Sequence, residues 1–388
     1  MNGKKKILIF STAYFPFVGG AEVAVKEITD RLSEDFEFDL ITAKLEKNLP
    51  KVEKVGAVTV YRIGSGRPML DKLLLPFRGA LLARRLDRTQ DYFCFWGIMA
   101  TFASGAAYIF NISRKLSGKK KIPVVLSLQE GDSETHLKYK WFGLIGLSWK
   151  LAMRQTDVLT GLSTFLLKRG EKNGFKGRSV LVPNGVDLQL FTQEINPETK
   201  NEMKNRLGKK EGDVFLVTTS RLNHKNAVDD VIRSLQALPQ NIHFIVIGKG
   251  DDGPALQKLA DALGVSTRVK FLGFVPYTDL PMYLSACDIF VRPSRSEGFG
   301  NSFIEAMAAG LPVIATPVGG IPDFIDDRQT GLFCAPDAPQ SIAKAVEAIL
   351  GDNGLKSALI QNGKARVIER YGWDHIAGLM KSVFGMLD

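Results

Sequence analysis

Short apolar segments that alternate with helical patterns restrict the fold of this chain more than any other feature. In the first half, strands are predicted at residues 6–12, 38–42, 58–62, 124–128 and 179–183, and the first helix is predicted over residues 21–32. After a polar helix over residues 197–207 the pattern restarts, with strands predicted at residues 214–220, 243–248, 269–272, 289–292 and 312–316. Strands that alternate with helices form parallel sheets covered on both faces. The chain is therefore predicted to be an α/β protein with two doubly wound, Rossmann-like domains.

The length of 388 residues agrees with two domains, because a single hydrophobic core stops growing at roughly 250–300 residues. A turn signal at Pro183-Asn184-Gly185 and the polar stretch after it place the boundary near residues 185–200. We expect an N-terminal domain over residues 1–187 and a C-terminal domain over residues 188–373. A last helix, over about residues 374–388, could pack back on the first domain.

The net charge of +10 is unevenly distributed along the chain. Residues 1–187 hold 30 Lys and Arg against 18 Asp and Glu, whereas the remainder holds 21 against 23. Such asymmetry indicates that the first half faces something anionic, either a phospholipid surface, a pyrophosphate-linked acceptor or nucleic acid. A basic face that is simply solvated is the alternative.

The cysteines and the N-terminal segment favour a reducing, cytoplasmic location. Cys94, Cys287 and Cys334 are scattered and lack a CxxC spacing, which argues against a disulfide framework and against a zinc site. Lysines at positions 4–6 before an apolar run imitate a secretory signal, but a glycine pair and an amphipathic helical pattern follow, so we predict a first core strand. No apolar run reaches the ~20 residues that a transmembrane helix needs.

Two glycine motifs follow predicted strands, and each has a functional and a packing interpretation. Gly19 and Gly20 stand where a strand passes into a helix, so their amides could meet an anionic phosphate; a tight packing turn explains them equally well. The run from Gly248 to Gly253 matches GxGxxG, but the dinucleotide fingerprint also needs an acidic residue after the next strand, and residues 269–274 contain none. A tight strand-to-helix turn is the better interpretation of the second motif.

Arg221 and Lys225 follow the strand predicted at residues 214–220, at the edge of the sheet where open α/β folds bind ligands. Two cations four residues apart could neutralise a diphosphate, since Arg offers a planar fork and Lys a point charge. An exposed helix start would explain the same two residues.

The most informative stretch reads SRSEGFGNSFIEAMAAG, from position 294 to position 310. Gly298, Gly300 and Asn301 open a helix there, and the amides of a helix start can hold phosphate oxygens. Glu297 precedes this helix. Glu305 lies more than one turn inside it among apolar residues, where a carboxylate is costly unless it has hydrogen-bonding partners such as a ribose diol. A helix cap with an incidental salt-bridged Glu explains these residues singly but poorly as a set.

These motifs together resemble a known family. Arg221 with Lys225, the pair Glu297 and Glu305, and the run Gly319-Gly320-Ile321-Pro322 are similar to the donor half of family 4 (GT4) retaining glycosyltransferases of the GT-B fold. Gly19-Gly20 and residues 156–163 and 182–187 fit the same family in the first half, so the resemblance spans nearly the whole chain. It implies two Rossmann-like domains that face a cleft.

The resemblance also implies a nucleotide-sugar site on the C-terminal domain. Arg221 and Lys225 would hold the diphosphate, Glu305 the ribose hydroxyls, and Glu297 would approach the sugar; Glu297 and the two cations are the candidate catalytic residues. Further donor contacts are implied for Gly19, Gly20, Phe274, Val275, Gly298, Phe299, Gly300, Asn301, Ser302 and Phe303. The family needs no metal, because cations and a helix start stabilise the departing diphosphate. The nucleotide sugar is a substrate, so no cofactor is expected.

The mechanism favoured for the family transfers the sugar with retention, and the leaving phosphate oxygen receives the acceptor proton on the same face of the sugar. No dedicated base is then required. The family's usual histidine follows a strand of the type predicted at residues 124–128, but this chain has Gln129 there, which hydrogen bonds and does not titrate. This departure bears on the identity of the sugar more than on the reaction type. Glu130 and Asp132 are candidate acceptor-side groups, with an ordinary surface loop as the alternative.

Two stretches, residues 69–88 and 136–154, combine cations, aromatic residues and leucines. Such segments can lie in a membrane interface, attracted by anionic lipid and anchored by Trp. Buried amphipathic helices explain the leucines as well. We favour peripheral contact with an anionic membrane on the cytoplasmic side, and with it a lipid-linked glycan acceptor.

The sequence thus predicts a glycosyltransferase that uses a UDP- or GDP-linked sugar in cell-surface polysaccharide or glycolipid biosynthesis. A catalytically inactive sugar-nucleotide-binding homologue and a nucleotide-sugar epimerase of the same fold are the alternatives. A nucleic-acid-binding module would leave Glu297 and Glu305 unexplained, so no nucleic-acid partner is expected.

Overall fold

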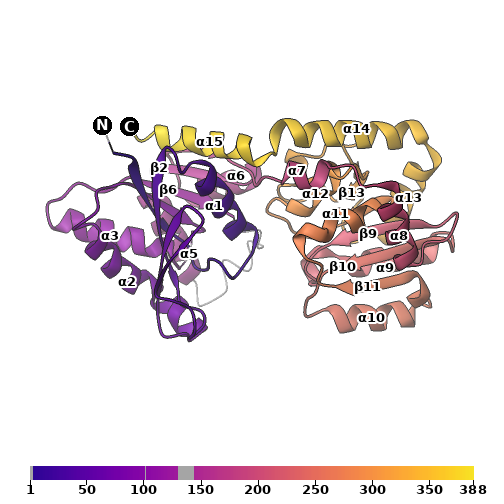
Figure 1. Cartoon of the computed structure of the whole chain (residues 1–388), viewed down its shortest axis with the longest axis horizontal. Coiled ribbons are helices and arrows are strands. Elements are labelled where there is room, and N and C mark those ends of the chain that lie inside the picture. Colours follow the sequence, from indigo (N-terminus) through magenta and orange to yellow (C-terminus); the bar gives the residue numbers. More distant parts are fainter. Residues whose placement is uncertain (1–2, 101, 130–143) are drawn as a thin grey trace. The chain divides into compact units, whose positions relative to one another are not determined.

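The computed structural model describes residues 3–100, 102–129 and 144–388, and the chain divides into two compact units (Figure 1). Unit 1 comprises Met1–Asn184 and Trp373–Asp388, and unit 2 comprises Gly185–Gly372. Within the described ranges, none of the helices combines the length and the hydropathy that a membrane span requires.

Unit 1 is built on a sheet with the strand order β3-β4-β2-β1-β5-β6-β7-β8. Its strands are β1 (Lys5–Phe10), β2 (Phe36–Ala43), β3 (Val52–Val55), β4 (Val58–Ile63), β5 (Tyr92–Ile98), β6 (Val124–Leu128), β7 (Val158–Gly161) and β8 (Arg178–Leu181). Its helices are α1 (Gly20–Arg31), α2 (Pro68–Leu86), α3 (Ser104–Leu116), α5 (Leu144–Gln155), α6 (Thr164–Lys172) and α15 (Trp373–Gly385). Neighbouring strands run parallel except β3 and β4, which pair antiparallel at one edge.

Unit 2 is built on a sheet with the order β11-β10-β9-β12-β13-β14, in which neighbouring strands are parallel. Its strands are β9 (Val214–Thr219), β10 (Ile242–Ile247), β11 (Val269–Gly273), β12 (Ile289–Arg292), β13 (Val313–Ala315) and β14 (Leu332–Phe333). Its α-helices are α7 (Leu188–Thr192), α8 (Pro197–Leu207), α9 (Val228–Ser234), α10 (Gly253–Ala262), α11 (Leu280–Ser285), α12 (Asn301–Ala308), α13 (Pro339–Gly351) and α14 (Asn353–Arg370). Short 3₁₀ turns lie at η2 (His224–Asn226), η3 (Leu235–Ala237), η4 (Ser266–Arg268), η5 (Tyr277–Asp279) and η6 (Ile321–Asp323).

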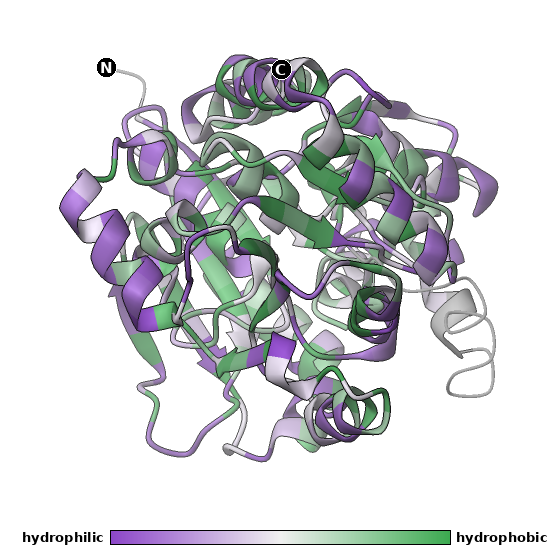
Figure 2. Cartoon of the chain, turned by 90° about the vertical axis from the view of Figure 1, so that its right-hand side faces the viewer, coloured by the Kyte–Doolittle hydropathy of each residue, from purple (hydrophilic) through white to green (hydrophobic). Residues whose placement is uncertain are grey.

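The central strands are apolar along their whole length rather than alternately apolar and polar. In β1, the residues from Ile7 to Phe10 are fully buried, and the strand pairs with β2 on one side and β5 on the other. A parallel strand with helices on both faces has no solvated side, which is why such strands read as continuous apolar runs. Figure 2 shows strands coloured as hydrophobic beneath helices that carry hydrophilic segments.

The last helix, α15, belongs to the core of unit 1, beside α1 (Figure 1). Trp373, Ile376, Met380 and Phe384 are all buried in that core. The ring of Phe384 makes edge contacts with Phe36 and Trp96, at centroid distances of 5.4 and 5.6 Å. The chain therefore completes the first unit only after it has traversed the second.

The strands predicted from the sequence are present with boundaries shifted by at most a few residues, and α8 and β12 have the predicted bounds. The sequence pattern missed β3, β5, β7 and β14. The strand β5 reads YFCFWGI, and its aromatic residues fill the middle of the sheet, with Phe95 and Trp96 buried. The strand β14 has two residues, too few for any period to be visible.

Replacing Phe384 with Ala should lower the free energy of unfolding of unit 1 by about 3–5 kcal/mol, because it leaves a cavity between rings that cannot collapse. Urea unfolding followed by Trp fluorescence measures this. Met386→Ala, at an exposed position just beyond the same helix, is the control and should change stability little. Equal effects of the two variants would show that α15 is not part of the core.

Candidate functional site

The candidate site of unit 2 lies at the carboxyl edge of its sheet, where the strand order reverses. From β9 the sheet grows through β10 and β11 on one side, and the chain then returns to place β12, β13 and β14 on the other side. Open α/β sheets bind ligands outside the carboxyl ends of the strands at such a switch point. The loops after β9, β12 and β13 carry Arg221, Lys225, Glu297 and the pair Gly319-Gly320.

The loop after β9 holds Arg221 and Lys225 in a short turn. The Arg221 carbonyl accepts a hydrogen bond of 2.6 Å from the buried side-chain amide of Asn226. Ala227 follows at φ 52°, in the left-handed region, and α9 begins directly after it. The Arg221 side chain is exposed and Lys225 is half-buried, so the turn presents both at the edge of the sheet.

Arg295 fastens this turn to the loop after β12. Its backbone amide donates to the Lys225 carbonyl at 2.8 Å, and its guanidinium donates to the His224 carbonyl at 2.9 Å. The same guanidinium binds both carboxylate oxygens of Asp229, at 2.8 and 3.0 Å, and contacts Asp230 at 2.8 Å. Burial alone would raise the pKa of Asp229, but the hydrogen bonds from Arg295 hold it below its ordinary value. Arg295 therefore links the loop after β12 to the turn after β9 that carries Lys225.

Glu297 lies in the loop after β12 and its carboxylate turns back toward its own loop. One oxygen accepts hydrogen bonds from the amides of Gly298, at 2.9 Å, and Phe299, at 3.4 Å. The other oxygen forms an ion pair with Arg292. The family resemblance implies that Gly298 and Phe299 contact the donor, but in this structure their amides donate to Glu297.

The backbone of Glu297 is covered by the glycine pair that follows β13. The Glu297 carbonyl accepts a hydrogen bond of 3.2 Å from the amide of Gly320. Gly319 has φ +58°, and a Cβ there would lie 1.8 Å from the same carbonyl oxygen. Only glycine permits this approach, so the run from Gly319 to Pro322 supports the loop of Glu297.

The helix α12 carries Glu305 beside the same loop. The helix begins at Asn301 after Gly300, which has φ 101°, and Ser302 and Phe303 in its first turn are buried. Burial raises the pKa of the Glu305 carboxyl to about 7, and the positive charge of Arg292 opposes this shift. A ligand that donates hydrogen bonds to the carboxylate would relieve the cost of burying its charge.

Arg292 also belongs to this site, although none of the sequence motifs includes it. It ends β12, is 7% exposed, forms an ion pair with Glu297, and its charge lowers the pKa of Glu305. The sequence does contain one indication of it. Arg292 is a charged residue at the end of the otherwise apolar strand Ile289–Arg292, and a charge buried there needs partners.

Unsatisfied polar atoms surround the end of β9. The hydroxyl of Ser220 and the side-chain carbonyls of Asn223 and Asn226 are buried without a hydrogen-bond partner among the described residues. Buried polar atoms in folded proteins are usually paired, so this cluster indicates a place that a polar ligand or ordered water completes. It lies next to Arg221.

The residues predicted near the base follow β11. Phe274 is 71% exposed and Val275 is buried. The carbonyl of Gly273 accepts a hydrogen bond of 2.7 Å from Gly248, so the loops after β10 and β11 adjoin each other. A Cβ at Gly250 would lie 2.0 Å from the Leu222 carbonyl oxygen, which gives the second glycine motif a packing reason, as the sequence analysis favoured.

In unit 1, Gly19 caps the start of α1 and Gly20 is the first residue of that helix, after the loop that follows β1. The side chain of Glu22 folds over them: a Cβ at Gly19 would lie 2.7 Å from a Glu22 carboxylate oxygen. Burial raises the pKa of Glu22, while hydrogen bonds from the amides of Glu22 and Gly19 lower it. The helix start that could receive a phosphate therefore already has a carboxylate beside it.

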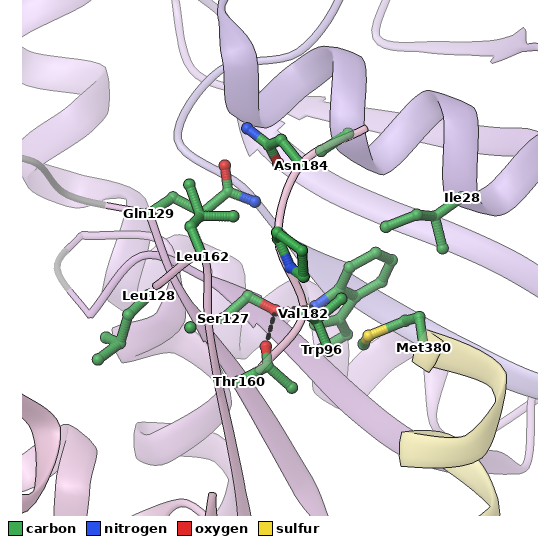
Figure 3. Close-up of a pocket in the computed structure, with 13 residues that line it drawn as sticks. Ile28, Trp96, Ser127, Leu128, Gln129, Thr160, Leu162, Val182, Asn184 and Met380 are labelled. Atoms are coloured by element: carbon green, nitrogen blue, oxygen red, sulfur yellow. Dashed lines mark hydrogen bonds between the residues drawn. The ribbon is translucent and has the colours of Figure 1, made fainter. Parts of the chain in front are cut away.

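Gln129 follows β6 and lines a small pocket of unit 1 (Figure 3). At its floor the Trp96 ring nitrogen donates to the Ser127 hydroxyl at 2.8 Å, and that hydroxyl lies 2.6 Å from the hydroxyl of Thr160. Figure 3 shows Gln129 and Asn184 at the same end of the pocket. The pocket has room for a water molecule rather than a sugar ring. Glu130 and Asp132 lie outside the described residues.

The potential metal ligands are dispersed in the part of the chain that the structure describes: no three His, Cys, Asp or Glu side chains there are arranged to hold an ion. Arg221, Lys225, Arg292 and Arg295 bring positive charge to the end of β12 and to the loops after β9 and β12.

Two sequence families divide the chain between them. Residues 18–190 match Glycosyltransferase Family 4, and residues 199–366 match Glycosyl transferases group 1. An uncharacterised glycosyltransferase of Methanocaldococcus jannaschii is 32% identical over 394 residues, which cover 96% of each chain. A GDP-mannose-dependent monoacylated alpha-(1-6)-phosphatidylinositol monomannoside mannosyltransferase of Corynebacterium glutamicum is 32% identical over 235 residues, 57% of this chain and 60% of that protein.

The solved structure of sucrose-phosphate synthase from Thermosynechococcus elongatus is similar with a TM-score of 0.81 and 21% identity, over 99% of both chains. At this identity the likeness concerns the fold. The two-domain GT-B fold predicted from the sequence is thereby confirmed.

Replacing Glu305 with Gln should change how stability depends on pH. Burial raises the pKa of Glu305 from 4.5 to about 7, so between these values the folded protein holds a proton that the unfolded chain releases. The free energy of unfolding of the wild type, relative to Glu305→Gln, should therefore fall by roughly 2–3 kcal/mol from pH 5 to pH 8. Urea unfolding at several pH values measures the difference. The exposed Glu369→Gln is the control, and a pH-independent difference for Glu305→Gln would contradict the prediction.

Proposed function

Because the chain belongs to the GT4-type glycosyltransferases of the GT-B fold, we propose that it transfers a sugar with retention from a nucleotide-diphosphate sugar to a lipid-linked glycan acceptor. The product serves cell-surface polysaccharide or glycolipid synthesis. The observation that supports the donor site most is the concentration of two cations in the loop after β9 and two carboxylates in the loop after β12 and in α12, at the switch point of the unit 2 sheet.

Each of the four side chains has a proposed role. Arg221 and Lys225 neutralise the diphosphate and stabilise it as it leaves. Glu305 accepts hydrogen bonds from the ribose hydroxyls, which offsets the cost of its burial. Glu297 approaches the sugar. The orphaned polar atoms of Ser220 and its neighbours beside Arg221 support a ligand at this place.

The proposed reaction needs little covalent chemistry from the protein. The bond between the anomeric carbon and the leaving phosphate oxygen breaks, and the acceptor oxygen bonds to the same carbon on the same face. The leaving phosphate oxygen takes the acceptor proton, so the scheme needs no side-chain base and agrees with Gln129 in place of a histidine. Charge stabilisation by fixed cations carries the step, and neither a metal nor a cofactor is required.

The donor is a UDP- or GDP-linked sugar. The relative from Corynebacterium glutamicum is GDP-mannose-dependent and named for a phosphatidylinositol mannoside acceptor, which supports a lipid-linked acceptor here. Phe274, exposed at the end of β11, is suited to stack on the base, since aromatic rings recognise flat ring systems by their faces.

The proposed membrane contact lies on α2 in unit 1. Five apolar side chains of this helix are exposed: Met69, Leu73, Phe77 and Leu81, which are four residues apart and form a stripe, and Leu70 next to Met69. The exposed cations of the same segment are Arg67, Arg78, Arg84, Arg85 and Arg88.

The acids of α2 and its C-terminal cap have partners within unit 1, and one partner of Asp71 is Arg78, at 3.6 Å. Asp71 is buried and accepts from the amides of Ser65, Gly66 and Arg67, and Asp87 pairs with Arg114. An apolar stripe bordered by arginines suits the interface of an anionic bilayer. Contact there would hold the protein at the cytoplasmic face of the membrane, where a lipid-linked acceptor lies.

Nucleotide binding tests the donor site. Thermal unfolding with UDP, GDP, ADP and TDP, without added metal, should show stabilisation by one of them, by about 2.7 kcal/mol at a hundred times its dissociation constant. Arg221→Ala and Glu305→Ala should lose most of this gain, while the exposed Arg328→Ala, elsewhere in unit 2, should keep it. If no nucleotide stabilises the wild type at millimolar concentration, the transferase proposal is wrong. Binding without transfer or donor hydrolysis would favour an inactive homologue, and release of an epimerised sugar nucleotide would favour an epimerase.

Vesicle cosedimentation tests the α2 stripe. The wild type should bind vesicles that contain about one-third phosphatidylglycerol more tightly than pure phosphatidylcholine, and Phe77→Ser with Leu81→Ser should weaken binding about tenfold or more, because two large apolar side chains are lost. Ile368→Ser, which removes an exposed apolar side chain from α14, is the matched control. If vesicle binding depends neither on lipid charge nor on the α2 substitutions, the membrane proposal is wrong. The donor-site proposal is not affected by that result.

A further inference from the structure

We infer that Arg292 is a positioning residue that fixes the orientation of the Glu297 carboxylate, and that this orientation sets the preference of the protein for a nucleotide sugar over the bare nucleoside diphosphate. The inference rests on the proposed function, because it assigns Glu297 to the sugar. It adds a residue outside the motif by which the family is identified in this sequence.

Arg292 joins three separate parts of the site. Its Nε donates to the Ser294 hydroxyl at 3.0 Å, just after β12, and one Nη donates to the Ser302 hydroxyl at 2.6 Å, in the first turn of α12. The other Nη forms the ion pair with Glu297. The guanidinium also lies over the ring of Phe303, 4.8 Å from its centroid. A planar fork with fixed donors can hold these three groups at once, and an ammonium group cannot.

The carboxylate of Glu297 is consequently held through both oxygens. Arg292 binds one oxygen, and the amides of Gly298 and Phe299 bind the other. A carboxylate held on two sides has little freedom to turn. Any group that meets Glu297 from the open side therefore meets it in one orientation, which is the condition for selective hydrogen bonding to a sugar hydroxyl.

The electrostatic environment supports the same assignment. Burial lowers the pKa of Arg292 to about 10, which leaves the side chain charged at neutral pH, and the nearby Glu305 opposes the shift. A buried cation is costly unless it is paired, and the ion pair with Glu297 and the nearby charge of Glu305 offset this cost. Arg292 also offsets repulsion between these carboxylates and a diphosphate, an effect common to nucleotides with and without a sugar.

Arg268 provides a comparison within the same unit. It is equally buried, but its guanidinium donates to backbone carbonyls, those of Leu235, Leu238, Pro239 and Ile242. It therefore ties a loop together without contacting a carboxylate of the site. Arg268 thus has a structural role, and it is the control for the positioning role inferred for Arg292.

The test is the ratio of dissociation constants for a nucleoside diphosphate and its sugar conjugate, measured by calorimetry with UDP and UDP-glucose and with GDP and GDP-mannose. Effects common to both ligands cancel in this ratio. Arg292→Met should reduce the preference for the sugar nucleotide about tenfold or more, since it removes a charged hydrogen-bond partner of Glu297. Glu297→Gln should cause a similar loss, and the double variant should lose no more than the larger single loss.

Two further variants separate positioning from stability. Arg292→Lys should recover only part of the preference, because it restores the charge without the fork. Arg268→Met should lower the melting temperature and leave the ratio unchanged. An unchanged ratio in folded Arg292→Met, additive losses in the double variant, or an equal loss in Arg268→Met would each overturn the inference.

Ser302→Ala covers the case in which Arg292→Met does not fold. It removes one anchor of the guanidinium and should lower the preference by a smaller factor, with unchanged circular dichroism. An unchanged ratio in this variant would count against the inference. If the wild type binds none of the four ligands, the proposed function itself fails and the inference fails with it, whereas normal wild-type binding with an unaffected Arg292→Met overturns the inference alone.

Discussion

The direction of the strands is the constraint on which the rest of this structure depends. In unit 2 all neighbouring strands are parallel, so the loops after β9, β12 and β13 leave the sheet at the same edge. The reversal of strand order between β9 and β12 then separates the helices that follow them and leaves space above the sheet. Residues more than seventy positions apart, such as Arg221 and Glu297, meet at one edge for this reason.

Packing of the loops against each other fixes what the strands bring together. Arg295 links the turn of Lys225 to the loop of Glu297, and the pair Gly319-Gly320 supports the same loop from the other side. Arg292, at the end of β12, links the Glu297 carboxylate to the first turn of α12. The arginines of these loops differ in their partners. Arg295 pairs with Asp229 and Asp230, Arg292 pairs with Glu297, and the side chain of Arg221 is exposed. These contacts fix the candidate site in place, as preorganised binding of the proposed diphosphate would require.

In each unit a carboxylate lies beside backbone amides near the start of a helix, but the two carboxylates have different partners. In unit 1 the carboxylate of Glu22 lies over Gly19, and in unit 2 that of Glu297 accepts from Gly298 and Phe299. Both are carboxylates beside amides that would otherwise attract an anion. Among the residues that the structure describes, the carboxylate of Glu297 is paired with a buried cation, Arg292, and that of Glu22 has no ion pair with a cation.

The sequence alone determined the α/β class, the two sheets, most strand positions and the motif residues Arg221, Lys225, Glu297 and Glu305, because periodicity and local motifs are properties of adjacent residues. It missed β5, whose aromatic run has no clear period, and β14, which is too short. Only the tertiary structure decided that α15 completes the core of unit 1, that the α2 stripe is exposed, and that Arg292 joins Glu297 to α12. Those facts depend on contacts between residues far apart or on which helix face a neighbour covers, and neither is written in a local pattern.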